Sequence, residues 1–175
     1  MINLEWIISS VIIIIFCTIS MITLADVDFS TFTKKKKIIS AVYFITYLTI
    51  NIAIQIILGF ELYGDFYLLF TQLPLYILLF ILTRYRGMKL VFLYLSTTIF
   101  SSTAMFLSSF IIYFTKMPII GVLPSYALLL WVSERFLKKP FFYILEYADN
   151  RIIGWLSTLP VLYYIYNYYT TKYQY

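Results

Sequence analysis

The side chains most often used in catalysis are scarce in this sequence of 175 residues. It has no histidine, so the commonest general base, metal ligand and phosphoacceptor is missing. Cys17 is the only cysteine, so it has no partner for an intrachain disulfide, and we interpret it as a small buried hydrophobic residue. We therefore predict that the chain is not an enzyme and binds no cofactor or metal. A peptidase that matures signalling peptides would need a nucleophile together with a base.

Three polar residues have the spacing of one helical face. Tyr47, Asn51 and Gln55 lie at i, i+4 and i+8 in an otherwise apolar stretch. Within a membrane such groups are costly and usually face protein. They could line a ligand cavity, or they could form hydrogen bonds between helices, which is the interpretation that we favour. The other ligand-sensing candidates are Glu61, Asp65 and Gln72.

Composition identifies the class of protein that must position these residues. Hydrophobic residues make up 62% of the chain and charged residues 12%, and the mean hydropathy is +0.89. A soluble domain could not bury so much apolar surface. Long apolar stretches without alternation favour helices over a membrane barrel. We predict an all-α integral membrane protein. The segment MINLEWIISS has no basic residue and no cleavage pattern follows it, so we expect the first span to be retained.

Six apolar segments approach the roughly 20 residues that cross a bilayer. Their predicted limits are residues 6–25, 38–60, 66–82, 90–114, 119–136 and 152–169. Pro74 and Pro160 are expected to kink the third and sixth spans. The polar stretch 138–150 contains the amphipathic run FFYILEY and is expected to lie along the membrane surface. The whole chain, residues 1–175, is predicted to be one polytopic membrane domain.

Basic residues predict the orientation of the bundle, because cytoplasmic loops are enriched in them. Eleven of the thirteen fall after the odd-numbered segments: Lys34, Lys35, Lys36, Lys37, Arg84, Arg86, Lys89, Arg135, Lys138, Lys139 and Arg151. The opposite side has Lys116 and Lys172. Both termini are therefore predicted to lie on the outer side of the cell membrane. We interpret the basic residues mainly as topology anchors, with an anionic-lipid site as the alternative, and no nucleic-acid partner is needed.

Two further patterns have a structural and a functional interpretation. The fourth segment carries stripes of small or polar residues, which predict a close-packed interface inside the molecule or, alternatively, a homodimer face. The stripes are Thr97, Ser101, Ala104 and Ser108, and Thr98, Ser102, Met105 and Ser109. The C-terminal run LYYIYNYYTTKYQY is typical of an aromatic belt at the membrane surface. The alternative is a stacking surface for an extracellular ligand.

Two stretches resemble the membrane sensor domains of GHKL-type histidine kinases of Firmicutes, which are relatives of quorum-sensing peptide receptors. The first, QLPLYILLFILTRYRGMKLVFLYLSTT, has the Leu73-Pro74 entry, the Arg84-Tyr85-Arg86 turn and the following Phe92. The second, FLKKPFFYILEYADNRIIGWLSTLPVLYYIY, has a basic pair before Pro140, then Gly154-Trp155 and the stretch 160–164. Together with the spacing of the spans, the resemblance covers most of the chain.

The resemblance implies a sensor module of a bacterial two-component system, located in the cytoplasmic membrane. Such kinases typically have a seventh helix before a phosphoacceptor region and an ATPase domain. This sequence has neither the phosphoacceptor histidine nor the ATP-binding motifs, so we expect a sensor without its kinase part. Its implied partners are membrane lipids, an extracellular peptide, and a homodimer or a separate kinase. The alternative function is the substrate-binding membrane subunit of a small-molecule transporter, whose termini would both be cytoplasmic.

Overall fold

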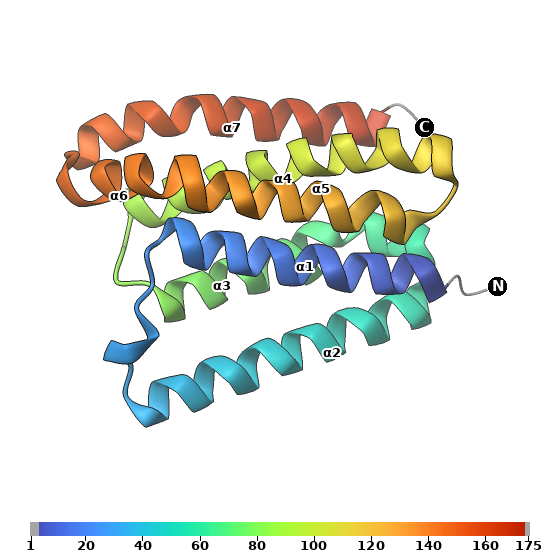
Figure 1. The fold of residues 1–175 in the computed structure, drawn as a ribbon, viewed down its shortest axis with the longest axis horizontal. Coiled ribbons are helices and arrows are strands. Elements are labelled where there is room, and N and C mark those ends of the chain that lie inside the picture. Colours follow the sequence, from blue (N-terminus) through green and yellow to red (C-terminus); the bar gives the residue numbers. More distant parts are fainter. Residues whose placement is uncertain (1–3, 174–175) are drawn as a thin grey trace.

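The computed structural model describes residues 4–173, except for the side chains at positions 60, 61, 64, 65, 68, 167, 168 and 170–173. All regular structure in this part of the chain is helical (Figure 1). The α-helices are α1 (Leu4–Leu24), α2 (Lys34–Asp65), α3 (Leu73–Leu82), α4 (Met88–Thr115), α5 (Pro118–Val132), α6 (Lys138–Tyr147) and α7 (Asn150–Tyr173). A 3-10 turn, η1 (Phe29–Thr31), and two π-helical turns, η2 (Leu68–Gln72) and η3 (Ser133–Leu137), connect them. The prediction of an all-helical chain is confirmed.

Four helices are long and apolar enough to cross a membrane. They are Leu4–Leu24, Lys34–Gly59, Met88–Thr115 and Pro118–Tyr147. They contain the predicted first, second, fourth and fifth segments. The third segment corresponds to a shorter apolar helix, Leu69–Leu82, and the sixth lies within α7. α2 breaks at Gly59, which has a φ of 75° and a ψ of 170°. Glycine adopts this backbone conformation readily because it has no side chain, so the span ends there.

Basic residues gather at one end of the bundle. Figure 1 shows the start of α1 and the end of α7 at the same end, labelled N and C. The eleven basic residues that sequence analysis grouped together lie on α-helix ends and connections at the opposite end, which we call the basic end. Lys116 lies at the terminal end, where it caps α4 with a φ of 58°. The helices therefore separate the charges as the sequence predicted, although which end faces the cytoplasm stays a prediction.

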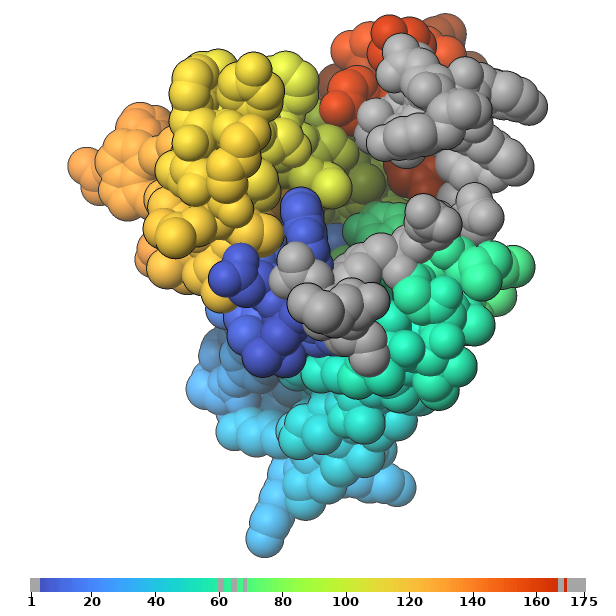
Figure 2. Space-filling model, turned by 90° about the vertical axis from the view of Figure 1, so that its right-hand side faces the viewer, coloured from blue at the N-terminus to red at the C-terminus, as the bar shows by residue number. Residues whose placement is uncertain are grey.

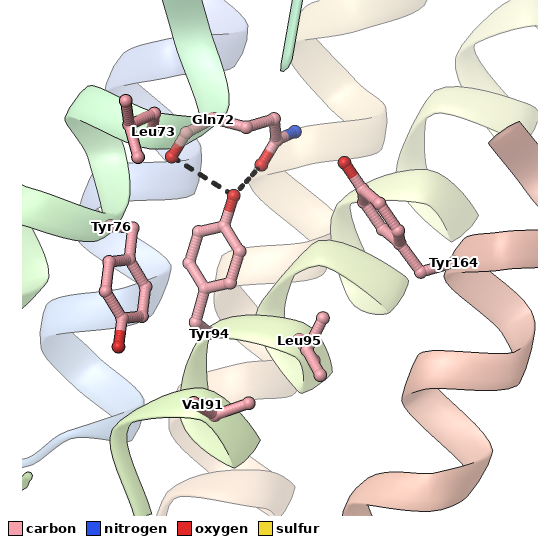
Figure 3. A pocket seen from close by; sticks show the side chains of 7 residues that line it. All are labelled: Gln72, Leu73, Tyr76, Val91, Tyr94, Leu95 and Tyr164. Atoms are coloured by element: carbon pink, nitrogen blue, oxygen red, sulfur yellow. Dashed lines mark hydrogen bonds between the residues drawn. The ribbon is translucent and has the colours of Figure 1, made fainter. Parts of the chain in front are cut away.

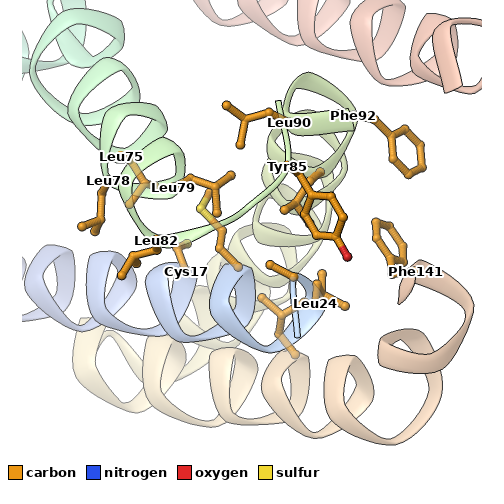
Figure 4. Packing of buried hydrophobic residues seen from close by; sticks show 14 of the residues in the cluster. Cys17, Leu24, Leu75, Leu78, Leu79, Leu82, Tyr85, Leu90, Phe92 and Phe141 are labelled. Atoms are coloured by element: carbon orange, nitrogen blue, oxygen red, sulfur yellow. The ribbon is translucent and has the colours of Figure 1, made fainter. Parts of the chain in front are cut away.

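α1 lies inside the bundle, and α2 lies at its edge. In the most apolar 18-residue stretch of each helix, the buried share is 44% for α1 but only 17% for α2. α1 contacts α5, α4, α2 and α3, whereas α7 packs mainly along α4. Figure 4 shows the core near the basic end, where Leu24 and Cys17 of α1 meet leucines of α3 and Leu90 of α4. Phe141 of α6 stacks on Phe92, with ring centroids 5.5 Å apart.

Small residues form the contact between α4 and α5. Thr97, Ala104 and Ser108 are buried on α4, in agreement with the predicted intramolecular interface. The helices approach so closely at Gly121 that a Cβ atom there would lie 2.3 Å from Ile112 Cγ1 and 2.8 Å from the Ser108 carbonyl oxygen. In a bilayer, close backbone approach of this kind replaces the hydrophobic effect as a source of helix association. The second stripe is less enclosed: Met105 is 57% exposed.

The predicted surface segment 138–150 is directly continuous with α5. The backbone stays helical from Pro118 to Tyr147 and passes through the π-helical turn η3. Phe141 and Leu145 are buried, while Tyr143 and Tyr147 are exposed, so α6 is amphipathic as its sequence indicated.

A glycine also directly precedes α4. Gly87 has a φ of 59°, which allows the tight connection from α3.

The outer surface is strongly apolar. Large exposed side chains include Ile57 of α2, Phe106 and Phe114 of α4, and Trp155 and Leu159 of α7. Their exposed fractions range from 68% to 80%. Contiguous apolar surface around a helical bundle is unfavourable in water but matches the hydrocarbon core of a bilayer. The structure is therefore compatible with a membrane location.

Candidate functional site

α3 begins with an irregular turn that needs hydrogen-bond donors from elsewhere. The π-helical turn Leu68–Gln72 leads into α3, and Pro74 lies in its first turn. Pro74 has no N–H group, so the carbonyl of Phe70, one turn earlier, receives no backbone donor from that position. An unpaired carbonyl is costly in an apolar environment. Neighbouring helices must satisfy this part of the backbone.

One face of α2 supplies three hydrogen bonds to carbonyls of this turn and of the first turn of α3. The hydrogen bonds run from Tyr43 Oη to the carbonyl of Pro74 at 3.0 Å, from Tyr47 Oη to that of Thr71 at 3.2 Å, and from Asn51 Nδ2 to that of Phe70 at 3.0 Å. The donors lie on successive turns of α2. Each turn of this face of α2 therefore reaches a different carbonyl near the start of α3, and side-chain hydrogen bonds join the two segments at three points along α2.

Asn51 is the centre of this cluster and is fully buried. Besides its bond to Phe70, Nδ2 donates to the Tyr47 carbonyl at 3.1 Å. Its Oδ1 accepts from Tyr63 Oη at 2.6 Å and from Thr71 Oγ1 at 3.0 Å. Tyr63 Oη also bonds Thr71 Oγ1. The amide thus uses two donor and two acceptor positions, which is its full capacity.

Gln55 extends the same polar face toward α1. It is 2% exposed, and its Oε1 accepts a hydrogen bond from Ser10 Oγ at 2.8 Å. Its Nε2 has no acceptor within hydrogen-bonding distance among the described residues, and neither does the buried Ser9 hydroxyl have a partner there. Buried polar atoms in proteins are nearly always paired. Gln55 Nε2 and the Ser9 hydroxyl are therefore buried polar groups whose hydrogen bonds the described residues do not satisfy.

Gln72 joins α3 to α4 beside a cavity of about 290 Å³. Tyr94 Oη bonds both the Gln72 carbonyl, at 3.1 Å, and its side-chain Oε1, while Gln72 Nε2 donates to Tyr67 Oη at 3.2 Å. Figure 3 shows Tyr94 between Tyr76 and Tyr164, with its hydroxyl toward Gln72. Leu73, Val91 and Leu95 complete the lining. We call this space the α3–α7 groove; α3, α4 and α7 form its walls.

A second, smaller cavity lies on the other side of α3. Its volume is about 170 Å³, and it lies between α2 and the start of α3. The lining residues are Tyr43, Thr46, Tyr47, Ile50, Phe70 and Pro74. Figure 2 shows the end of the molecule that carries the termini, hollowed between α7, α4 and the end of α2. The irregular turn before α3 thus has a cavity on each side.

The buried face predicted for α2 is confirmed. Tyr47, Asn51 and Gln55 are 4%, 0% and 2% exposed, and each takes part in a hydrogen bond to another helix or to the turn before α3. Gln72 also lies in the cluster, whereas the side chains of Glu61 and Asp65 are outside the described residues. A role of any of them in ligand sensing stays a prediction.

Sequence reasoning missed four members of the cluster: Tyr43, Tyr63, Thr71 and Tyr94. Tyr43 lies one turn before Tyr47, so the same periodicity could have identified it. The other three lie on α2 beyond its break at Gly59, in the turn η2 and on α4, and no helical periodicity in the sequence predicts their contacts with Asn51 or Gln72. Their involvement follows from the packing of the bundle.

The cluster consists of hydroxyl and amide groups. Among the described residues no three His, Cys, Asp or Glu side chains lie close enough together to hold a metal ion. Cys17 is buried, and its sulfur lies 2.9 Å from Ser101 Oγ, which in turn contacts Tyr126 Oη at 3.2 Å. Hydroxyl and amide groups of this kind orient a ligand or hold helices together.

Among the described residues, two ion pairs connect neighbouring elements at the basic end. Arg84 Nη2 lies 2.6 Å from Glu146 Oε2, and Lys138 Nζ lies 2.8 Å from Asp26 Oδ1. Lys36 Nζ donates to the Leu82 carbonyl at 3.3 Å, at the C-terminal end of α3, where a cation favours the helix dipole. Burial raises the pKa of the Tyr85 hydroxyl, which lies beside Arg84 in the connection to α4.

Comparisons with protein-family models, with curated proteins and with solved structures found no match. The function must therefore be inferred from the sequence and from the geometry of the bundle.

Proposed function

We propose that this chain is a membrane-embedded receptor module of a signalling system, with six membrane-spanning helices and with both termini outside. The observation that carries the proposal is the start of α3. There, side chains from α2 and α4 donate to carbonyls of the π-helical turn and of the first turn of α3. Asn51 in particular donates to the Phe70 carbonyl, which Pro74 leaves without its helical N–H donor. This is an element that can exchange partners without unfolding a helix.

Such an element supports a receptor because a ligand must distinguish two arrangements of the protein to produce a signal. Hydrogen bonds between membrane helices contribute about 0.6 kcal/mol each on average. Exchanging a few of them therefore costs an amount comparable with typical coupling energies of about 1–3 kcal/mol. π-helical turns also occur frequently at functional sites. The two cavities beside the turn provide places where a ligand would bias α3.

The orientation in the proposal follows from the separated charges. Eleven basic residues at one end favour the cytoplasmic side for that end. The terminal end, with the α2–α3 connection, then faces outward, where an extracellular peptide would arrive. In this arrangement the signal passes along α3 toward the basic end, where a kinase would respond.

The resemblance to GHKL-type sensor domains supports the same class of function. These 175 residues contain no histidine, so they cannot carry a phosphohistidine themselves. We expect no incorporation of phosphate from ATP by the purified chain. Measurable autophosphorylation would contradict the proposal directly.

A transporter subunit is the competing function, and topology separates the two. A periplasm-type phosphatase or a fluorescent protein is fused after Tyr175 and, in separate chains, after Gly87 at the basic end. The receptor proposal requires phosphatase activity at Tyr175 and fluorescence at Gly87. The reverse pattern would place the basic end outside and would overturn the proposed orientation together with the receptor function.

Ligand binding is tested with short peptides fractionated from culture medium of the source cells. A binding fraction should raise the unfolding temperature of the purified chain. The rise should be smaller for Gln72→Ala, which alters the groove, than for Thr49→Val, which changes an exposed residue of α2. If the unfolding temperature rises equally for both variants and the wild type, the peptide does not bind at this site, and the proposed ligand site is wrong.

A further inference from the structure

The α3–α7 groove has apolar walls, and cations lie at the basic end of its α3 and α7 walls. Leu73, Tyr76, Val91, Leu95 and Tyr164 line it, and its volume of about 290 Å³ is close to the lower limit of about 300 Å³ for small-molecule pockets. Leu73 and Tyr76 are followed on the same face of α3 by Phe80, which is 47% exposed. The α3 wall thus continues as an apolar stripe toward the basic end.

Arg86 terminates this stripe. Its guanidinium lies over the Phe80 ring, 4.1 Å from the centroid. Nη1 donates to the carbonyls of Thr83 and Tyr85, at 2.8 and 2.6 Å, which fixes the side chain in place. The Nε and Nη2 groups carry three further N–H donors. Arg86 is exposed, so this side of the guanidinium is accessible at the membrane surface.

The α7 wall ends in the same way, because Arg151 lies in the first turn of α7. This turn lies close to the start of α4, because a Cβ atom on Gly154 would lie 3.9 Å from Met88 Cε. Lys89 of α4 lies two residues before Val91, which places it on the opposite side of the helix from the groove. Arg86 and Arg151 are therefore the cations at the basic end of the α3 and α7 walls.

The acidic residues nearby in the sequence are already engaged. Glu146 forms the ion pair with Arg84, and its carbonyl lies 3.5 Å from Lys89 Nζ. Asp149 Oδ1 accepts from the Asn150 N–H at 2.7 Å, at the start of α7. For Arg151, the structure gives no ion-pair partner among the described residues. The basic end of the groove thus keeps a positive charge that favours an anion.

Depth decides which anion fits. Lys89 lies six residues from Leu95, or about 9 Å along the helix, and one leaflet of the hydrocarbon core is about 15 Å thick. An acyl chain attached to a headgroup at the basic end reaches the groove. A free phosphate or a water-soluble anion would leave the apolar walls uncovered.

We propose that the α3–α7 groove binds one acyl chain of an anionic glycerophospholipid, whose phosphate is held by Arg86 and Arg151. The lipid belongs to the leaflet at the basic end. It fills the space between α3 and α7, so it fixes the position of α3 relative to α4. The site stands independently of the receptor function.

The test measures lipid retained by the purified chain in native mass spectrometry, with phosphatidylglycerol and phosphatidylcholine of identical acyl chains. The wild type should retain one phosphatidylglycerol in preference to phosphatidylcholine. A surface cation contributes roughly a fivefold factor to binding of an anionic lipid, so the double variant Arg86→Gln, Arg151→Gln should weaken phosphatidylglycerol binding about 25-fold.

The matched control removes two other exposed cations of the basic end: Lys34→Gln, Lys139→Gln. It should leave the tightly bound lipid in place. Leu95→Trp, which fills the groove, should reduce retention of phosphatidylglycerol without changing the charge. Equal retention of the two lipids by the wild type overturns the proposal and requires no variant. Equal losses in the control and in the groove variant would show general attraction to the basic end, which also overturns it.

Discussion

Asn51 provides the sharpest test of how the bundle is held together. Asn51→Leu keeps the branched shape and the number of side-chain heavy atoms but removes all four hydrogen bonds of the amide. The carbonyl of Phe70 then loses the donor that Asn51 Nδ2 supplies at 3.0 Å. Because Pro74 provides no N–H there, nothing in the α3 backbone replaces it at that position. The result should be an unpaired buried carbonyl.

The magnitude follows from the individual bonds. Leaving a buried acceptor unpaired costs about 1–3 kcal/mol. The bonds to Tyr63 and Thr71 contribute about 0.6 kcal/mol each, and these two hydroxyls still bond each other. The carbonyl of Tyr47 lies within α2 and keeps its helical partner, so its loss matters little. We expect Asn51→Leu to lower the free energy of unfolding by about 2–4 kcal/mol.

Reversible unfolding in mixed micelles, with increasing fractions of denaturing detergent, measures this change. Thr49→Val is the control, because Thr49 is exposed on the same helix and bonds only the Ile45 carbonyl one turn away, at 2.9 Å. Its effect should stay within about 0.5 kcal/mol. A loss for Asn51→Leu no larger than for the control would refute the structural role of the cluster.

A double-mutant cycle tests the reason for the loss. Pro74→Ala restores a backbone N–H one turn after Phe70, so the carbonyl gains a donor inside α3. In this background Asn51→Leu should cost at least about 1 kcal/mol less than in the wild type. If the cost of Asn51→Leu is the same in both backgrounds, Asn51 does not compensate for the proline and the explanation fails.

Three other predictions concern packing and charge. Gly121→Ala should destabilise the bundle by about 1–3 kcal/mol, because the added methyl meets the Ser108 carbonyl and Ile112, whereas Gly154→Ala, with Met88 Cε at 3.9 Å, should be tolerated; detergent unfolding of both variants measures the contrast, and equal losses would contradict it. Lys138→Met should change stability by no more than about 1 kcal/mol, because the side chains of Lys138 and Asp26 are 42% and 44% exposed; a larger loss in the same assay would show a role beyond this pair. Hydrogen bonds from the Ser30 hydroxyl and then from its N–H lower the pKa of Asp28, so the stabilisation is present above the unfolded-state pKa of about 3.9 and is lost as the pH falls through the lower folded value. The stability difference between wild type and Asp28→Asn should therefore shrink in acid, and a difference that grows below pH 4 would reverse the sign.

The sequence predicted the helices well because each is a local pattern. Apolar length located the six segments, and the separation of basic residues matched the two ends of the bundle. The face with Tyr47, Asn51 and Gln55 was correct for the same reason, since i, i+4 spacing places residues on one side of a helix irrespective of its neighbours. The same argument extends to Tyr43.

The remaining features depend on contacts between distant segments. Pro74 indicated that a carbonyl would be freed, but which residues would donate to it depends on how α2 and α4 lie against α3. Tyr63 contributes because α2 breaks at Gly59, and an apolar stretch shows no sign of such a break beyond the glycine itself. The groove beside α7 was likewise not predictable, because it depends on three helices that fail to close completely.

The position of α3 connects these observations. It is ten residues long, so one end lies only about 15 Å from the other. At its start, side chains of α2 and α4 hold the carbonyls next to both cavities, and at its end Lys36 holds the Leu82 carbonyl while also lying 3.8 Å from the centre of the Phe32 ring. A rigid helix that shifts at its first turn must disturb this second contact or rotate about it. Under the proposed function, we expect a ligand or lipid that changes either cavity to act through α3 on the Lys36 contact at the basic end, without touching it.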